Sequence, residues 1–141
     1  MAIVRKILFL MGVFSFLSGA FGGEPTKTNR ELEDLEAMFA EIRAQPNWKA
    51  DSELLWGYFF TDPDPTKLEP LAKQLASDGY RVVAIYPTDD GSTHFLHVER
   101  IEHHTPKTLH ARNQEFEALA AKFHVQSYDG MDVGPVLPSS D

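Results

Sequence analysis

The six histidines are candidate metal ligands and general bases, because a neutral imidazole can bind a metal ion or accept a proton. His94 and His97 are three positions apart in a segment with strand character, so their side chains should point to opposite faces. His97 and Glu99 share a face at a spacing that suits metal ligands, but two ligands do not make a defined site. We therefore predict no metal and no cofactor. A metal binder or small hydrolase built on His97 and Glu99 is kept as one alternative.

Nucleophilic catalysis has little support in the sequence. No serine stands in the Gly-x-Ser-x-Gly context that places a nucleophile on a sharp turn, and the chain has no cysteine to act as a thiol nucleophile. The paired acids Asp89 and Asp90 fall at an expected hairpin tip, where turn formation explains them. The sequence thus predicts a protein that is not an enzyme.

The stretch YDGMDVGPV at residues 128–136 contains two acids and two glycines, which suggests a phosphate or calcium loop. A phosphate loop leads into the N-terminus of a helix, whereas this stretch follows a predicted helix. A calcium loop needs acids at alternating positions and a closing glutamate, which are missing here. We predict instead a short strand at 125–128, a turn at Asp129 and Gly130, and a final segment at 131–136 that packs back on the domain.

Alternating aromatic residues mark the predicted strand at residues 52–61. Gly57 would allow a helix to approach closely, so its side of the strand is predicted to face the helices. Trp56, Tyr58 and Phe60 then lie on the open face of the sheet. Together with His97 and Glu99 of a neighbouring strand, these three aromatic residues are the candidate partner-binding residues.

The N-terminus has the pattern of a secretory signal peptide. Arg5 and Lys6 precede a charge-free apolar run at residues 7–17, and small residues follow, with cleavage predicted after Ala20 or Gly22. The run is shorter than the roughly 20 residues that span a bilayer, so membrane contact is expected only through this leader. The predicted location is outside the cytoplasm, in the periplasm. An uncleaved membrane anchor and a cytoplasmic protein are the alternatives.

The charge of the mature chain limits its partners. Loss of residues 1–22 removes two of the 13 basic residues and none of the 21 acidic ones, which leaves a net charge of about −10. Such a field repels phosphate backbones and opposes direct nucleic-acid binding, although aromatic residues on an open sheet could stack on bases. A protein partner or self-association into a homo-oligomer is therefore predicted.

The elements predict an α+β domain of the ferredoxin-like class. Residues 23–50 form a linker and an amphipathic helix, and residues 51–141 form the domain proper, in which a Thr-x-x-Glu capping box at Thr66 opens the first helix. Strand, helix, strand, strand, helix and strand follow in order, which gives four antiparallel strands with two helices on one face. The predicted segments are helix 30–45, strand 52–61, helix 66–78, strands 80–87 and 93–101, a helix with Thr105 as N-cap, and strand 125–128.

The segment from Leu96 to Val136 resembles the family of the regulator of ribonuclease E activity B, a protein inhibitor of that RNA-degrading enzyme. In that family a helix of the type ELxxLAxxFxV is followed by Tyr-Asp-Gly. With the upstream stretches WGYFF and GYRVV, the resemblance extends over residues 54–136. The matching residues are Glu115, Phe116, Leu119, Ala120, Phe123, Val125, Tyr128, Asp129 and Gly130.

The resemblance implies a bacterial protein that regulates by contact. The founding inhibitor is cytoplasmic and has a strongly acidic tail, whereas this chain has a predicted export signal. We therefore predict an exported, non-catalytic domain that binds a protein partner through acidic loops or its aromatic face. The alternative is a cytoplasmic inhibitor of ribonuclease E that regulates RNA degradation.

Overall fold

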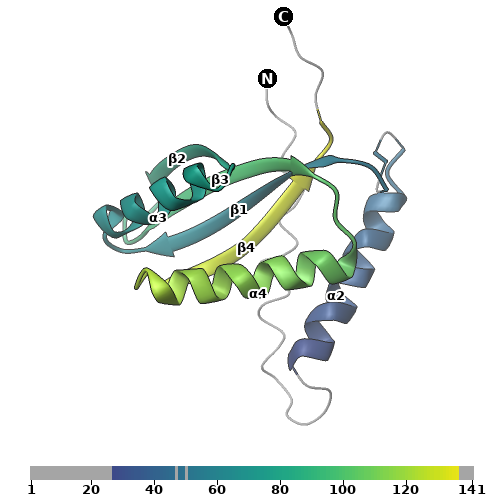
Figure 1. The fold of residues 1–141 in the computed structure, drawn as a ribbon, viewed down its shortest axis with the longest axis horizontal. Helices are drawn as coiled ribbons and strands as arrows, with labels where there is room; N and C mark the ends of the chain where they lie inside the picture. The colour runs from purple at the N-terminus through teal and green to yellow at the C-terminus, as the bar shows by residue number, and fades with distance from the viewer. Residues whose placement is uncertain (1–26, 47, 50, 137–141) are drawn as a thin grey trace, which may run out of the picture. The chain divides into compact units, whose positions relative to one another are not determined.

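The computed structural model describes residues 27–46, 48–49 and 51–136, so the predicted leader lies outside the described residues (Figure 1). The order of helices and strands agrees with the sequence-based prediction. Within these residues, no helix has both the length and the apolar character needed to cross a membrane. The elements are α2 (Lys27–Arg43), β1 (Leu54–Asp62), α3 (Pro65–Ser77), β2 (Arg81–Pro87), β3 (His94–Glu102), α4 (Pro106–Lys122) and β4 (Ser127–Gly134).

The strands form one four-stranded antiparallel sheet in the order β2-β3-β1-β4. This is the strand order expected when two strand–helix–strand halves interlock with right-handed connections. The predicted ferredoxin-like α+β class is therefore confirmed.

The predicted hairpin joins β2 and β3, which pair in antiparallel register from Arg81 opposite Glu99 onward. At its tip the Asp90 carboxylate accepts a hydrogen bond from the backbone N–H of Ser92 at 3.0 Å. Gly91 adopts a φ of 73°, a conformation that costs glycine little. The Asp-Gly pair thus forms the turn that its sequence predicts.

The chain divides into two compact units, each built from separate stretches. The first contains the described residues up to Leu55 together with residues 101–112 and 132–136. The second contains residues 56–100 and 113–131.

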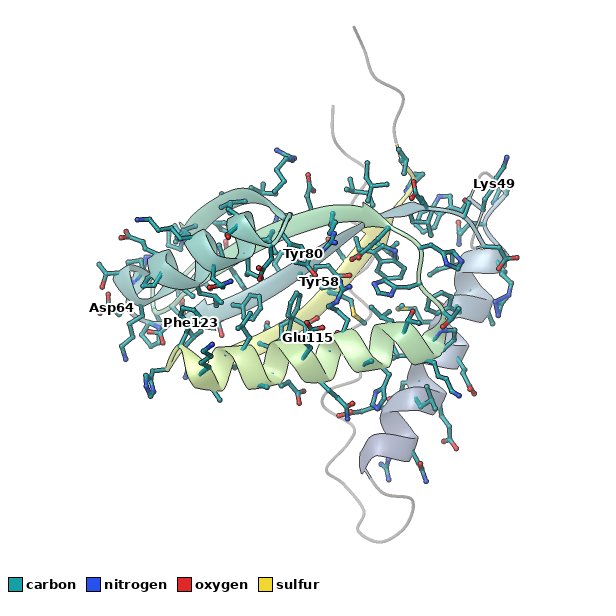
Figure 2. All side chains as sticks on the ribbon, viewed as in Figure 1. Lys49, Tyr58, Asp64, Tyr80, Glu115 and Phe123 are labelled. Carbon is teal, nitrogen blue, oxygen red and sulfur yellow. The ribbon has the colours of Figure 1, made fainter. Side chains whose placement is uncertain are left out.

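An aromatic cluster forms the core of the second unit. Phe116 of α4 is 2% exposed, and its ring centroid lies 5.1 Å from that of Tyr58 and 5.3 Å from that of Phe60. Tyr80 and Tyr128 each lie 5.5 Å from Phe116, and Tyr58 and Tyr80 are neighbours in Figure 2. The apolar stripe of α3 is fully buried as well: Leu68, Leu71 and Leu75.

The predicted orientation of β1 is wrong. Trp56 is 1% exposed, and Tyr58 and Phe60 are 0% exposed, so all three belong to the core and not to an open face. Phe59, from the opposite set, is only half-buried. Burial of large aromatic rings stabilises the fold more than the close approach of a helix to a glycine does. The set with more aromatic residues therefore faces the helices.

The start of α3 also differs from the predicted capping box. The helix begins at Pro65, and Asp64 is its N-cap, with a carboxylate that accepts a hydrogen bond from Thr66 N–H at 3.0 Å. Thr66 is therefore already helical. Because the N-cap is Asp64 and not Thr66, Pro70 lies two positions further into the helix than predicted. Aspartate is a strong N-cap, and proline fits the first helical position, which explains the earlier start.

In the first unit, α2 buries the apolar stripe that its periodicity predicts. Ion pairs add to the packing of this unit: His110 of α4 places Nδ1 4.0 Å from the Glu31 carboxylate of α2. Arg112 Nη1 donates to both carboxylate oxygens of Glu102, at 3.1 and 2.8 Å, in a charge-assisted pair. The buried residues of α2 are Leu35, Met38, Phe39 and Ile42.

The last strand corrects a second prediction. Residues 127–134 form one continuous strand, β4, where a turn was predicted at Asp129 and Gly130. Gly130 has a φ of 106°, so the backbone there is irregular without reversing. A glycine inside a strand often marks such a local distortion, because it alone adopts this conformation without strain.

Candidate functional site

Of the predicted partner-binding residues, the structure buries Trp56, Tyr58, Phe60 and Glu99, and it leaves His97 half-buried. Trp56, Tyr58 and Phe60 lie in the core and offer no surface to a partner. Glu99 of β3 is 4% exposed and forms an ion pair with Arg81 of β2. Among the described residues, no group of three or more histidine, aspartate or glutamate side chains is arranged to hold a metal ion.

Four rings on the face of the second unit that points away from Tyr58 and Phe60 form what we call the aromatic strip. The strip consists of Phe59, Tyr86, Phe95 and His97. The rings of Phe59 and His97 are stacked, with centroids 4.4 Å apart and planes 14° apart. Phe95 lies 6.0 Å from Phe59 and 5.6 Å from Tyr86, and Tyr86 is 38% exposed. The strip therefore offers apolar ring surface that the core does not use.

Sequence reasoning missed most of this strip because it assigned the set containing Phe59 to the inside. Once the face of β1 is known, the partners follow from strand pairing. Phe95 stands opposite Tyr86, and His97 stands opposite Ala84 in the hairpin register. His97 is the only strip residue that was among the predicted partner-binding residues.

The family-motif residues join α4 to β4 in the second unit. Phe116 is the centre of the aromatic core, and the hydroxyl of Tyr128 donates to Asn113 Oδ1 at 2.6 Å. Glu115 is exposed, and Leu119 and Phe123 are half-buried. The buried part of the motif thus has a packing role. Figure 2 shows Glu115 on α4 and Phe123 just beyond the C-terminal end of that helix.

Asp129 gives a testable pH dependence. Neighbouring protein atoms partly desolvate its carboxyl and raise its pKa above the ordinary 3.8. The Asp129 carboxyl therefore binds a proton more readily in the folded protein than in the unfolded chain. At pH above its folded pKa, the ionised carboxylate lowers the free energy of unfolding. We expect Asp129→Asn to raise the midpoint of urea unfolding slightly at neutral pH, with the gain disappearing as the pH falls below about 4. The effect is small because solvent screens the group.

Asp90 provides a matched control of opposite sign. The backbone and hydroxyl of Ser92 donate hydrogen bonds that lower the pKa of the Asp90 carboxyl. Its stabilising contribution is present above the unfolded pKa and is lost as the pH falls through the folded pKa. Asp90→Asn should therefore lower the midpoint at neutral pH and have no effect in acid. Equal shifts for both variants, or shifts independent of pH, would contradict this assignment.

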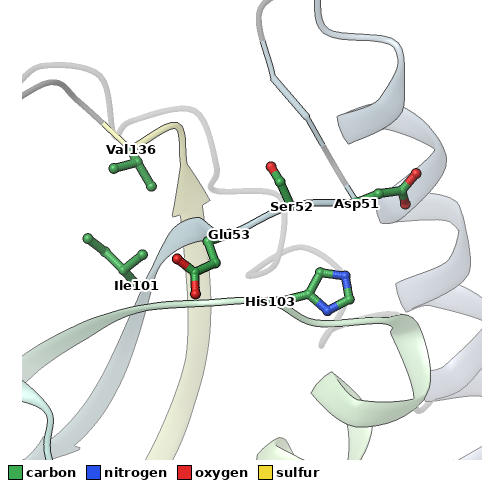
Figure 3. Close-up of a pocket in the computed structure, with 6 residues that line it drawn as sticks. All are labelled: Asp51, Ser52, Glu53, Ile101, His103 and Val136. Atoms are coloured by element: carbon green, nitrogen blue, oxygen red, sulfur yellow. The ribbon is translucent and has the colours of Figure 1, made fainter.

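The first unit contains an open pocket of about 740 Å³ (Figure 3). Ile101 and Val136 point toward one another there, and Glu53 lies between Ile101 and His103. Asp51 lies beyond Ser52 at the edge of the pocket, and its carboxylate points away from Ile101 and Val136. Sequence reasoning did not find this pocket, because its residues come from three separate stretches. The lining residues are Asp51, Ser52, Glu53, Ile101, His103 and Val136.

The fold and these surfaces define an α+β domain of the ferredoxin-like class with buried and exposed aromatic faces. Comparison with family models adds a specific assignment: the model described as "Regulator of ribonuclease activity B" matches residues 32–133. The chain belongs to this family. The match begins within α2, ends within β4 and includes the aromatic core. A search of curated proteins returned no match.

Proposed function

We propose that this chain is a non-catalytic regulator that acts by binding another protein. The observation that carries the proposal is the match of residues 32–133 to a family of regulators of ribonuclease activity. The aromatic strip supports it, because half-exposed rings on a sheet supply the apolar contact area typical of protein interfaces. In this view the core rings hold the sheet rigid, and the strip makes the contact.

We also propose that the protein is exported. The support is the leader pattern, in which Arg5 and Lys6 precede the apolar run at residues 7–17 and small residues follow. An exported chain does not meet a cytoplasmic ribonuclease, so its partner would lie outside the cytoplasm. The second candidate function is inhibition of ribonuclease E in the cytoplasm, which the family match favours.

Mass spectrometry of the native protein from fractionated cells separates the two candidates. Export predicts a chain that starts at Phe21 or Gly23 and is found in the periplasmic fraction. A cytosolic chain with an intact Met1 would contradict export and favour the second candidate. Slower cleavage of RNA by purified ribonuclease E in the presence of the full chain would then support direct inhibition.

Binding through the strip is tested with the natural protein as bait. A partner identified with the wild-type protein should be lost with Phe95→Ser, which removes a ring between Phe59 and Tyr86. The matched control is Ala72→Ser on α3, a half-buried position outside the strip. Retention of the partner by Phe95→Ser would count against the strip as the contact surface.

A further inference from the structure

The pocket of the first unit combines exposed apolar and acidic side chains. Ile101 is 48% exposed and Val136 is 42% exposed, so two of the most exposed large apolar side chains of the described residues share one pocket. Asp51 and Glu53 line the same pocket and are exposed, and no ion pair to either carboxylate occurs within the described part of the chain. An apolar floor with acidic sides is therefore available to a ligand.

We propose that this pocket binds an arginine or lysine side chain from a basic segment of the partner protein. The aliphatic stem would lie on Ile101 and Val136, and the cationic head would reach the carboxylate of Glu53, while Asp51 adds negative charge at the edge of the pocket. Both basic side chains cover apolar surface with their stems while the charged group stays at the rim. His103, when neutral, can accept a hydrogen bond from the same cationic head. This inference rests on the proposed function, since it assigns the chemistry of the partner's contact.

Other occupants fit the pocket less well. An anion would be repelled by Asp51 and Glu53, and a wholly apolar group would desolvate the two carboxylates without giving them a partner. The volume of about 740 Å³ lies within the range of ligand clefts, which is ample for one long side chain and its neighbours. The net charge of −8 for the full chain would also draw a basic segment toward the protein.

A peptide of alternating arginine and leucine residues is a direct probe. Its affinity for the full chain is measured by fluorescence anisotropy, and the site is located by NMR shifts of the backbone amides around Glu53 and Ile101. We expect binding that weakens with added salt. We expect Glu53→Gln to weaken it about threefold to fivefold, the size typical of one exposed ion pair. The double variant Asp51→Asn with Glu53→Gln should weaken it about tenfold.

Matched controls separate the pocket from a general acidic surface. Glu69→Gln removes an exposed acid of α3 in the second unit, and Val83→Ser removes an exposed apolar side chain of β2. Both controls should retain wild-type affinity, whereas Ile101→Ser should lose affinity. Equal losses for Glu53→Gln and Glu69→Gln would overturn the proposal. Equally tight binding of a peptide with glutamate in place of arginine would do the same.

The native partner distinguishes failure of this inference from failure of the proposed function. If wild-type protein captures its partner and the Asp51, Glu53 double variant captures it equally well, the pocket assignment is wrong and the binding function stands. If the arginine peptide binds at the pocket but the native protein neither captures a partner nor slows ribonuclease E, the proposed function is wrong. The pocket then remains a site for basic side chains.

Discussion

Replacement of Phe116 by alanine is expected to lower the free energy of unfolding by about 3–5 kcal/mol. The ring is 2% exposed and contacts four aromatic neighbours, with centroid distances from 5.1 to 5.5 Å. Its loss removes both buried apolar surface and the edge and tilted ring contacts, each worth about 0.5–1.5 kcal/mol. Against a typical domain stability of about 5–15 kcal/mol, this is a large fraction. Urea unfolding followed by tryptophan fluorescence gives the value.

Phe95→Ala is the control for this prediction, because it makes the same change on the aromatic strip. Phe95 also contacts two rings, Phe59 and Tyr86, but it is half-buried. We expect a loss of about 1 kcal/mol, since part of its surface already faces water. Equal losses for Phe95→Ala and Phe116→Ala would mean that the two faces of the sheet are equally covered, contrary to the structure.

The second large effect is expected at Asp62, at the end of β1. Asp62 is 4% exposed, and its carboxylate accepts hydrogen bonds from two backbone N–H groups. The N–H of Asp64 donates at 2.8 Å, and the N–H of Gln126 donates at 2.9 Å. The second bond ties the end of β1 to the chain just before β4. We expect Asp62→Ala to cost about 2–4 kcal/mol, because each partly buried N–H that loses its acceptor costs about 1–3 kcal/mol.

Two variants sharpen this test, again by urea unfolding. Asp62→Asn keeps one acceptor oxygen but places an amide NH₂ against the second N–H, so it should recover part of the loss. Asp64→Ala removes a neighbouring carboxylate that is exposed and caps α3 through Thr66. It should destabilise less than Asp62→Ala. If Asp64→Ala has the larger effect, the capping of α3 matters more to this loop than the link between Asp62 and Gln126.

Local signals in the sequence were sufficient for the order of elements and the fold class. The Asp-Gly pair at the hairpin tip and the start of α4 at Pro106 depend on a few adjacent residues, so they could be predicted directly. At that helix, Thr105 Oγ1 accepts the Thr108 N–H at 3.2 Å, as an N-cap should. The start of α3 was misjudged because Asp64 and Thr66 are both good caps, and the sequence alone did not rank them.

The amino-acid sequence by itself determined the α+β order and the hairpin, because each of these depends on neighbouring residues. It also indicated the family, through residues spread over 54–136. Only the tertiary structure decided which side of β1 faces inward. Strand alternation divides residues into two sets without saying which is buried, and both sets here are apolar. The pocket needed the tertiary structure too, since Glu53, Ile101 and Val136 are far apart in the chain. Only the folded backbone brings them together.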